Sequence, residues 1–115
     1  EDGCYSVKRW RSFHSDFSMA PIKPLTLVWT AVNRETSEGN KYSQDQRISV
    51  FNAMKSVTID AARTLNLEKE IGTLTPKKIA NFTILNENPF KVKPIRIKNI
   101  KVNAIVYKGK YVPTN

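Results

Sequence analysis

The chain has 115 residues and a formal net charge of +9, with 40% hydrophobic and 25% charged residues. This composition excludes a disordered chain and allows one domain with a core of modest size. One cysteine excludes an internal disulfide, and no apolar run approaches the roughly 20 residues that span a bilayer, so we expect no membrane contact. The polar, acidic first residues show no signal peptide. We therefore expect a cytoplasmic protein, with export of a full-length protein left open.

Helical periodicity marks the first half of the chain. Residues 7–13 have only a weak strand pattern. Pro24 suits the first turn of a helix, and apolar residues then recur at helical spacing, at Leu25, Val28, Trp29 and Val32. This pattern predicts an amphipathic helix over residues 24–33, and the polar segment 34–42 that follows predicts a surface loop.

Three N-cap signals follow the loop. Ser43 with Gln46 three residues later has the pattern of a capping box. Ser49 is a second N-cap candidate, and Thr58 is a third. The expected inward faces of the two helices that follow are Val50, Phe51, Ala53, Met54 and Val57, and then Ile59, Ala62 and Leu65.

Strand patterns replace the helical period after a turn at Thr75-Pro76. Residues 80–85 alternate as a strand does, and residues 100–107 with Tyr111-Val112 flank Lys108-Gly109, which predicts a hairpin. Helices therefore come first and strands second. That order predicts the α+β class or a boundary between two structural units.

Basic residues crowd the C-terminal part, and no acidic residue follows Glu87. Such a field can attract nucleic acid or an acidic partner. Lysines that alternate with Ile and Val also keep sheet edges from pairing wrongly. We favour this second interpretation, because lysines outnumber arginines here and no aromatic–glycine motif of the RNA-binding type accompanies them. A basic binding module remains the alternative function.

One acidic residue, Asp16, stands out in the segment from Phe13 to Pro21. An Asp directly after apolar residues often marks the point where a strand ends, and catalytic groups of barrel enzymes gather at such ends. A turn or cap role is the commoner one. His14 and Asp16 can share one side of a strand, but a catalytic metal site needs about three protein ligands. The residues alone indicate a basic α+β domain and no more.

Five stretches, taken together, resemble the C-terminal end of the metal-dependent amidohydrolases called amidohydrolase family 3. Their order and spacing cover nearly everything from Phe13 to Val112 and make the resemblance specific. The stretches are His14-Ser15-Asp16-Phe17 with Met19-Ala20-Pro21 and Pro24-Leu25; Ala31-Val32-Asn33-Arg34; Gln46-Arg47-Ile48-Ser49 with Ala53-Met54 and Thr58-Ile59-Asp60-Ala61-Ala62; Glu70-Ile71-Gly72-Thr73-Leu74 with residues 76–82; and Asn88-Pro89 with residues 100–102 and Lys108-Gly109-Lys110.

The resemblance implies the last strand and terminal helices of a (β/α)8 barrel, followed by strands of a small β-sandwich domain. On this mapping residues 1–67 are the end of the barrel, with Phe13 ending its eighth strand, and residues 68–115 are the C-terminal part of the sandwich. Such a barrel needs about 200 residues or more. We therefore expect a C-terminal fragment of a larger hydrolase, with the remainder of the barrel as its partner and with self-association through exposed apolar surface.

The family's eighth-strand aspartate, which is both catalytic and a metal ligand, falls on Asp16, and His14 is expected to line the pocket. The implied activity is hydrolysis of a non-peptide C–N bond in a small amide or cyclic amide, with water activated by a divalent metal, expected to be zinc. The carboxylate accepts a proton from this water and returns it to the leaving amine. The family's other metal ligands are missing from the sequence, so we expect the fragment to bind no metal and to be inactive alone. A degenerate regulatory homologue is a further alternative.

The sequence departs from the family pattern at two places. Lys77 stands where the family usually has Gly, in a Pro-Gly-Lys turn, and Asn81 stands where it usually has Asp. Both positions fall in the expected sandwich, so we expect these departures to affect the geometry of the turn more than the chemistry.

Overall fold

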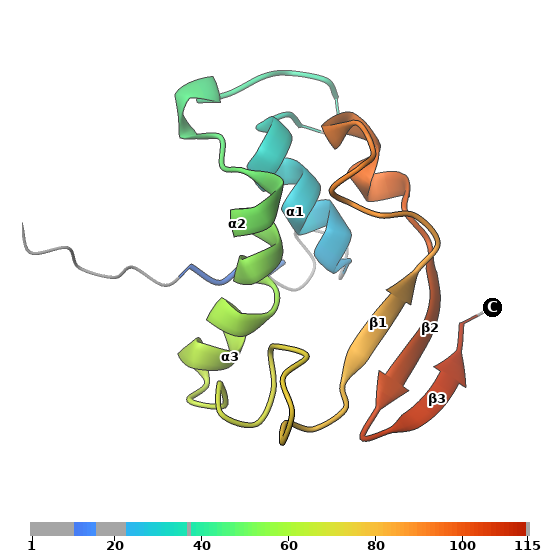
Figure 1. Cartoon of the computed structure of the whole chain (residues 1–115). Coiled ribbons are helices and arrows are strands. Elements are labelled where there is room, and N and C mark those ends of the chain that lie inside the picture. Colours follow the sequence, from blue (N-terminus) through green and yellow to red (C-terminus); the bar gives the residue numbers. More distant parts are fainter. Residues whose placement is uncertain (1–10, 16–22, 37, 115) are drawn as a thin grey trace, which may run out of the picture.

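The computed structural model describes residues 11–15, 23–36 and 38–114. Helices precede strands along the described chain, so the class is α+β, as predicted (Figure 1). None of the helices within these ranges is long and apolar enough to cross a bilayer. The elements are α1 (Pro24–Asn33), the 3-10 helix η1 (Gln44–Gln46), α2 (Val50–Ser56), α3 (Ile59–Thr64), β1 (Phe82–Leu85), the 3-10 helix η2 (Pro94–Asn99), β2 (Val102–Tyr107) and β3 (Lys110–Pro113).

Helix α1 has the bounds that the sequence predicts. Pro24 starts it, because the first turn of a helix needs no N–H from that residue and the ring already holds φ near the helical value. Its inner stripe is buried: Val28 is 0% exposed and Trp29 is 3% exposed. Arg34 ends the helix in the left-handed conformation, with φ of 51°, and its N–H donates to the Thr30 carbonyl oxygen at 2.8 Å.

The N-cap predictions have different outcomes. Ser49 caps α2, since its hydroxyl accepts a hydrogen bond from the N–H of Asn52 at 3.2 Å. The capping box at Ser43 is wrong: Ser43 takes a left-handed backbone with φ of 44°, whereas a capping serine needs an extended one. The cap at Thr58 is also wrong, although α3 does follow it. The Thr58 hydroxyl donates instead to the carbonyl oxygen of Met54 at 2.8 Å.

Helices α2 and α3 bury narrower faces than predicted. Ala53 and Ala62 are buried, but Phe51 is 62% exposed and Leu65 is 66% exposed, so the inward placement of these two large residues is wrong. Helices of 7 and 6 residues make about two turns each. Each can therefore turn only one narrow stripe toward a neighbour, and small residues occupy that stripe.

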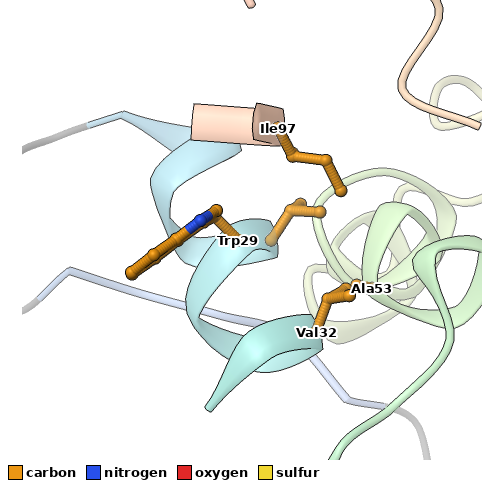
Figure 2. Close-up of a cluster of buried hydrophobic side chains, with 5 residues drawn as sticks. Trp29, Val32, Ala53 and Ile97 are labelled. Carbon is orange, nitrogen blue, oxygen red and sulfur yellow. The ribbon is translucent and has the colours of Figure 1, made fainter. Parts of the chain in front are cut away.

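The core gathers around α1 and joins distant parts of the chain. Val28, Trp29 and Val32 of α1 cluster with Ala53 of α2 and Ile97 of η2. Figure 2 shows the side chains of Val32 and Ala53 meeting between their helices, with Ile97 reaching in from η2. Because η2 lies in the strand half of the sequence, this cluster ties the two halves together.

The strands form one antiparallel sheet in the order β1-β2-β3. Lys108 and Gly109, with φ of 49° and 78°, make the predicted hairpin turn between β2 and β3. Thr83, Ile105 and Val112 stand opposite one another across the three strands. The sequence had a weak strand pattern over residues 7–13. Residues 11–13 form no strand, and residues 7–10 lie outside the described ranges. The barrel, the sandwich and the boundary near residue 67 stay predictions.

Candidate functional site

The catalytic candidate Asp16 lies outside the described residues, so its role as base and metal ligand stays a prediction. The segment that leads to it, residues 11–15, has no regular secondary structure. Within this segment Phe13 is half-buried and packs against the core cluster, whereas His14 is exposed. Phe13 lies three residues before Asp16 in the sequence, and its contact with the core holds the described segment in place at that point.

A cavity of about 440 Å³ lies where the C-terminal end of α1, the 11–13 segment and η1 come together. We call it the Arg34 cavity. Three arginines and one aspartate line it, together with three apolar residues. Its lining residues are Arg11, Phe13, Ala31, Arg34, Asp45, Gln46, Arg47 and Ile48.

The loop after α1 holds Arg34 beside η1. The side-chain amide of Gln44 donates to the carbonyl oxygens of Asn33 and Arg34, at 3.1 and 3.0 Å. One guanidinium nitrogen of Arg34, Nη2, lies 3.4 Å from Oε1 of Gln46. The Nε atom of Arg34 is buried and donates to no group in the described part of the chain. The guanidinium is therefore positioned by its surroundings while one buried donor goes unused.

The described residues contain no cluster of metal-binding side chains. No three His, Cys, Asp or Glu side chains within residues 11–15, 23–36 and 38–114 lie close enough together to hold a metal ion. These residues therefore do not supply the set of about three protein ligands that a catalytic metal site needs. A metal site in this sequence would therefore need at least one ligand from outside these ranges.

Two basic side chains of the C-terminal part make structural contacts. Nζ of Lys98 lies 4.0 Å from the centroid of the Trp29 ring, at cation–π distance. Arg96 pairs with Glu87 at 3.4 Å on the surface. These contacts favour the structural interpretation of both residues.

Comparison with known proteins gives the family. The sequence matches the Amidohydrolase family over residues 8–113. The chain belongs to this family. It is 29% identical over 101 residues to the putative amidohydrolase YtcJ of Bacillus subtilis, covering 85% of the chain. It is 28% identical over 91 residues to the N-substituted formamide deformylase of Arthrobacter pascens, covering 79% of the chain.

The relatives are much longer than this amidohydrolase chain. It spans 19% of the Bacillus protein and 17% of the deformylase. It is also 39% identical over 75 residues to the protein LONG AFTER FAR-RED 3 of Arabidopsis thaliana, covering 64% of the chain and 13% of that protein. The crystal structure of an uncharacterized protein superposes with a TM-score of 0.52 at 20% identity, over 63% of the chain and 18% of that structure. This likeness shows a shared fold.

Sequence reasoning singled out Arg34 only as part of a stretch that resembles the family, and it did not find the cavity. Arg11, Arg34 and Arg47 come from three separate segments, so no local spacing signals that they meet. The one local signal was an arginine directly after the apolar stripe of α1, in the position of a C-cap.

Proposed function

We propose that this chain is the C-terminal part of a metal-dependent hydrolase that cleaves non-peptide C–N bonds in small amides or cyclic amides. The observation that carries the proposal is the family match over residues 8–113. The class of bond is supported by the name of one relative, an N-substituted formamide deformylase, since deformylation of such a compound breaks an amide C–N bond. The small share of each relative that is spanned supports the status of a fragment.

The proposal extends to the architecture. Residues 1–67 would be the end of a (β/α)8 barrel and residues 68–115 part of a β-sandwich. A partly apolar, open sheet face supports this. Ile105, Tyr107 and Val112 are 42%, 56% and 50% exposed, and the strand register places them on one face, together with Thr83 and Lys110. A sheet normally buries an apolar face against a second layer. In our proposal the remainder of the parent protein covers it.

Asp16 is the proposed proton-handling group. A divalent metal, zinc in our proposal, lowers the pKa of water and supplies a nucleophile at neutral pH when it is bound. The Asp16 carboxylate would take up the proton that this water loses and pass it to the leaving nitrogen. Phe13 would hold the segment in place through its core contact, and His14 would line the pocket once the missing part of the barrel surrounds it.

The test uses the full-length parent and its hydrolysis of an N-substituted formamide. Asp16→Asn keeps the size of the side chain and removes the base, so kcat should fall by roughly 10²- to 10⁴-fold. The exposed loop residue Glu38 offers a matched control: Glu38→Gln should leave kcat unchanged. Full activity in Asp16→Asn would refute the assignment of Asp16 while leaving the family membership intact.

The isolated chain gives the second arm of the test. We expect no amide hydrolysis above the buffer rate, with or without added zinc, because the other metal ligands belong to the missing part. Zinc-dependent turnover by these 115 residues would contradict the proposed fragment. Retention on DNA that falls steeply with salt would favour the alternative of a basic binding module. A parent sequence without the other ligands would favour a degenerate regulatory homologue.

A further inference from the structure

We propose that the Arg34 cavity binds a small organic anion, with the oxyanion head on the Arg34 guanidinium and the organic body against Phe13 and Ile48. The proposal needs neither the metal nor Asp16, so it stands apart from the proposed hydrolase activity. The ligand class is a carboxylate or a phosphate monoester that carries a small apolar group. The volume, the charge, the unused donor and the backbone of Arg34 each support it.

The charge of the lining favours an anion. Arg11, Arg34 and Arg47 bring three positive charges to the cavity, and Asp45 offsets one of them. The Nε–H of Arg47 donates a hydrogen bond to the carbonyl oxygen of Gln44 at 3.0 Å, which holds the Arg47 side chain beside the cavity. Because guanidinium groups match carboxylate and phosphate oxygens in pairs, this excess of positive charge is suited to an oxyanion.

The Arg34 guanidinium offers a two-donor edge that is only half used. Nε–H and one N–H of Nη2 lie on the same edge of the planar group and can bind two oxygens of one anion side by side. Gln46 contacts Nη2 through a single neutral oxygen at the long distance of 3.4 Å. Nε is buried without an acceptor among the described residues. In our proposal an oxyanion displaces the exposed Gln46 side chain from Nη2 and also reaches the buried Nε, which removes the penalty of an unpaired N–H there.

The backbone of Arg34 is a second sign of a positioned side chain. Arg34 takes a left-handed conformation with φ of 51° at the end of α1, where glycine or asparagine is the usual residue. A side chain with a Cβ is less stable there, so such a residue persists only where its surroundings hold it. In this conformation the carbonyl oxygen of Arg34 accepts a hydrogen bond from the side-chain amide of Gln44.

The remaining wall selects an anion with an apolar body. Phe13, Ala31 and Ile48 also line the cavity, and all three pack on the core cluster, which holds them in place. A volume of about 440 Å³ lies within the range of small-molecule sites. An aromatic ring with one acidic group fits both the size of the cavity and its mixture of charged and apolar lining residues.

The experiment titrates the 115-residue chain while its backbone amides and arginine Nε–H groups are followed by NMR. The probes are benzoate, phenyl phosphate and the neutral benzyl alcohol. Both anions should shift the Arg34 Nε–H signal in a saturable way, and benzyl alcohol should not. Tighter binding of phenyl phosphate would assign a phosphate head, and tighter binding of benzoate a carboxylate head. The proposal fails if neither anion saturates the signal, or if benzyl alcohol shifts it as much.

Three variants sharpen the test. Arg34→Lys keeps the charge and removes the two-donor edge, so anion affinity should fall roughly tenfold. Arg96→Lys is the matched control, because Arg96 is an exposed arginine of η2 outside the cavity lining. The affinity of this variant for the anions should be unchanged. Should Arg34→Lys unfold, Gln46→Glu gives an independent reading: a carboxylate fixed beside Arg34 should abolish anion binding. An equal loss in Arg34→Lys and Arg96→Lys, or unchanged binding in Gln46→Glu, overturns the proposal.

Discussion

The indole Nε1 of Trp29 donates a hydrogen bond to the carbonyl oxygen of Ile95, 2.9 Å away and 66 residues later in the chain. Asn33, one turn further along α1, donates to the carbonyl oxygen of Pro94 at 3.0 Å. Lys98, at the other end of η2, lies over the Trp29 ring. These contacts dock η2 on α1 and so connect the helical half of the chain to the segment that enters the sheet.

Trp29→Phe should lower the free energy of unfolding by about 1–3 kcal/mol, because the variant loses the N–H and leaves the Ile95 carbonyl oxygen without this donor. Urea unfolding followed by circular dichroism measures the change. Lys98→Met is the control: it removes the cation–π contact alone, which is worth about 0.5–1 kcal/mol at an exposed site. A larger loss in Lys98→Met than in Trp29→Phe would show that the hydrogen bond is not the main link.

Gly72 lies in a position that has no room for a side chain. Its φ is +98°, and a Cβ there would lie 2.9 Å from the Cα of Ile59 and 3.0 Å from the Cβ of Ala62. Gly72→Ala should therefore cost roughly 2–4 kcal/mol, from overpacking and from the left-handed backbone together. Gly109 has φ of +78° with nothing within 4 Å of such a Cβ, so Gly109→Ala should cost only about 1–2 kcal/mol. Equal losses in urea unfolding would contradict the close approach of Gly72 to α3.

Lys77 takes a left-handed backbone, with φ of 75°. This explains why a glycine suits the position in the family resemblance. Lys77→Gly should raise the free energy of unfolding by up to about 1 kcal/mol, since relief of the backbone strain exceeds the added entropy of a glycine in the unfolded chain. Lys69 is an exposed lysine of a nearby turn without positive φ. Lys69→Gly should lower stability, and a gain of the same size there would refute the conformational explanation.

Asn81 anchors the hairpin turn through its side chain. Its Oδ1 accepts a hydrogen bond from the N–H of Lys108 at 2.8 Å, and the N–H of Gly109 donates to the carbonyl oxygen of Ala80 at 3.0 Å. An aspartate offers the same acceptor, so Asn81→Asp should change stability by less than about 0.5 kcal/mol. Asn81→Leu removes the acceptor and should cost about 1–2 kcal/mol. Thermal unfolding of the two variants decides this, and a leucine variant as stable as the original would contradict the anchor.

Local chemistry decided what the sequence could predict. The bounds of α1, the Ser49 cap and the turn at Lys108-Gly109 each depend on residues within one or two turns of the chain, and all three were predicted. The expected cap at Ser43 was wrong because Ser43 has a left-handed backbone, which the sequence does not indicate, and its side chain makes no cap hydrogen bond. Phe51 was misplaced because its partners depend on how α2 packs.

The functional features divide in the same way. Asp16 was found through a motif resemblance, which the described residues do not test. The Arg34 cavity was missed because its three arginines are brought together only by the packing of α1, η1 and the 11–13 segment. The contact between Trp29 and Ile95 was missed for a similar reason, since nothing near Trp29 in the sequence indicates a carbonyl oxygen 66 residues away.

The open sheet face predicts self-association of the isolated chain. Ile105 and Val112 are paired across β2 and β3 and remain 42% and 50% exposed, so a second copy can bury the apolar area that, in our proposal, the parent protein covers. Sedimentation velocity should show a species larger than the monomer that grows with concentration, and Ile105→Lys should shift the population to monomer. Tyr42 is more exposed, at 59%, but lies in the loop before η1, so Tyr42→Thr should sediment as the original chain does. A monomeric original chain, or association that persists in Ile105→Lys, would show that this face is not the surface through which the chain self-associates.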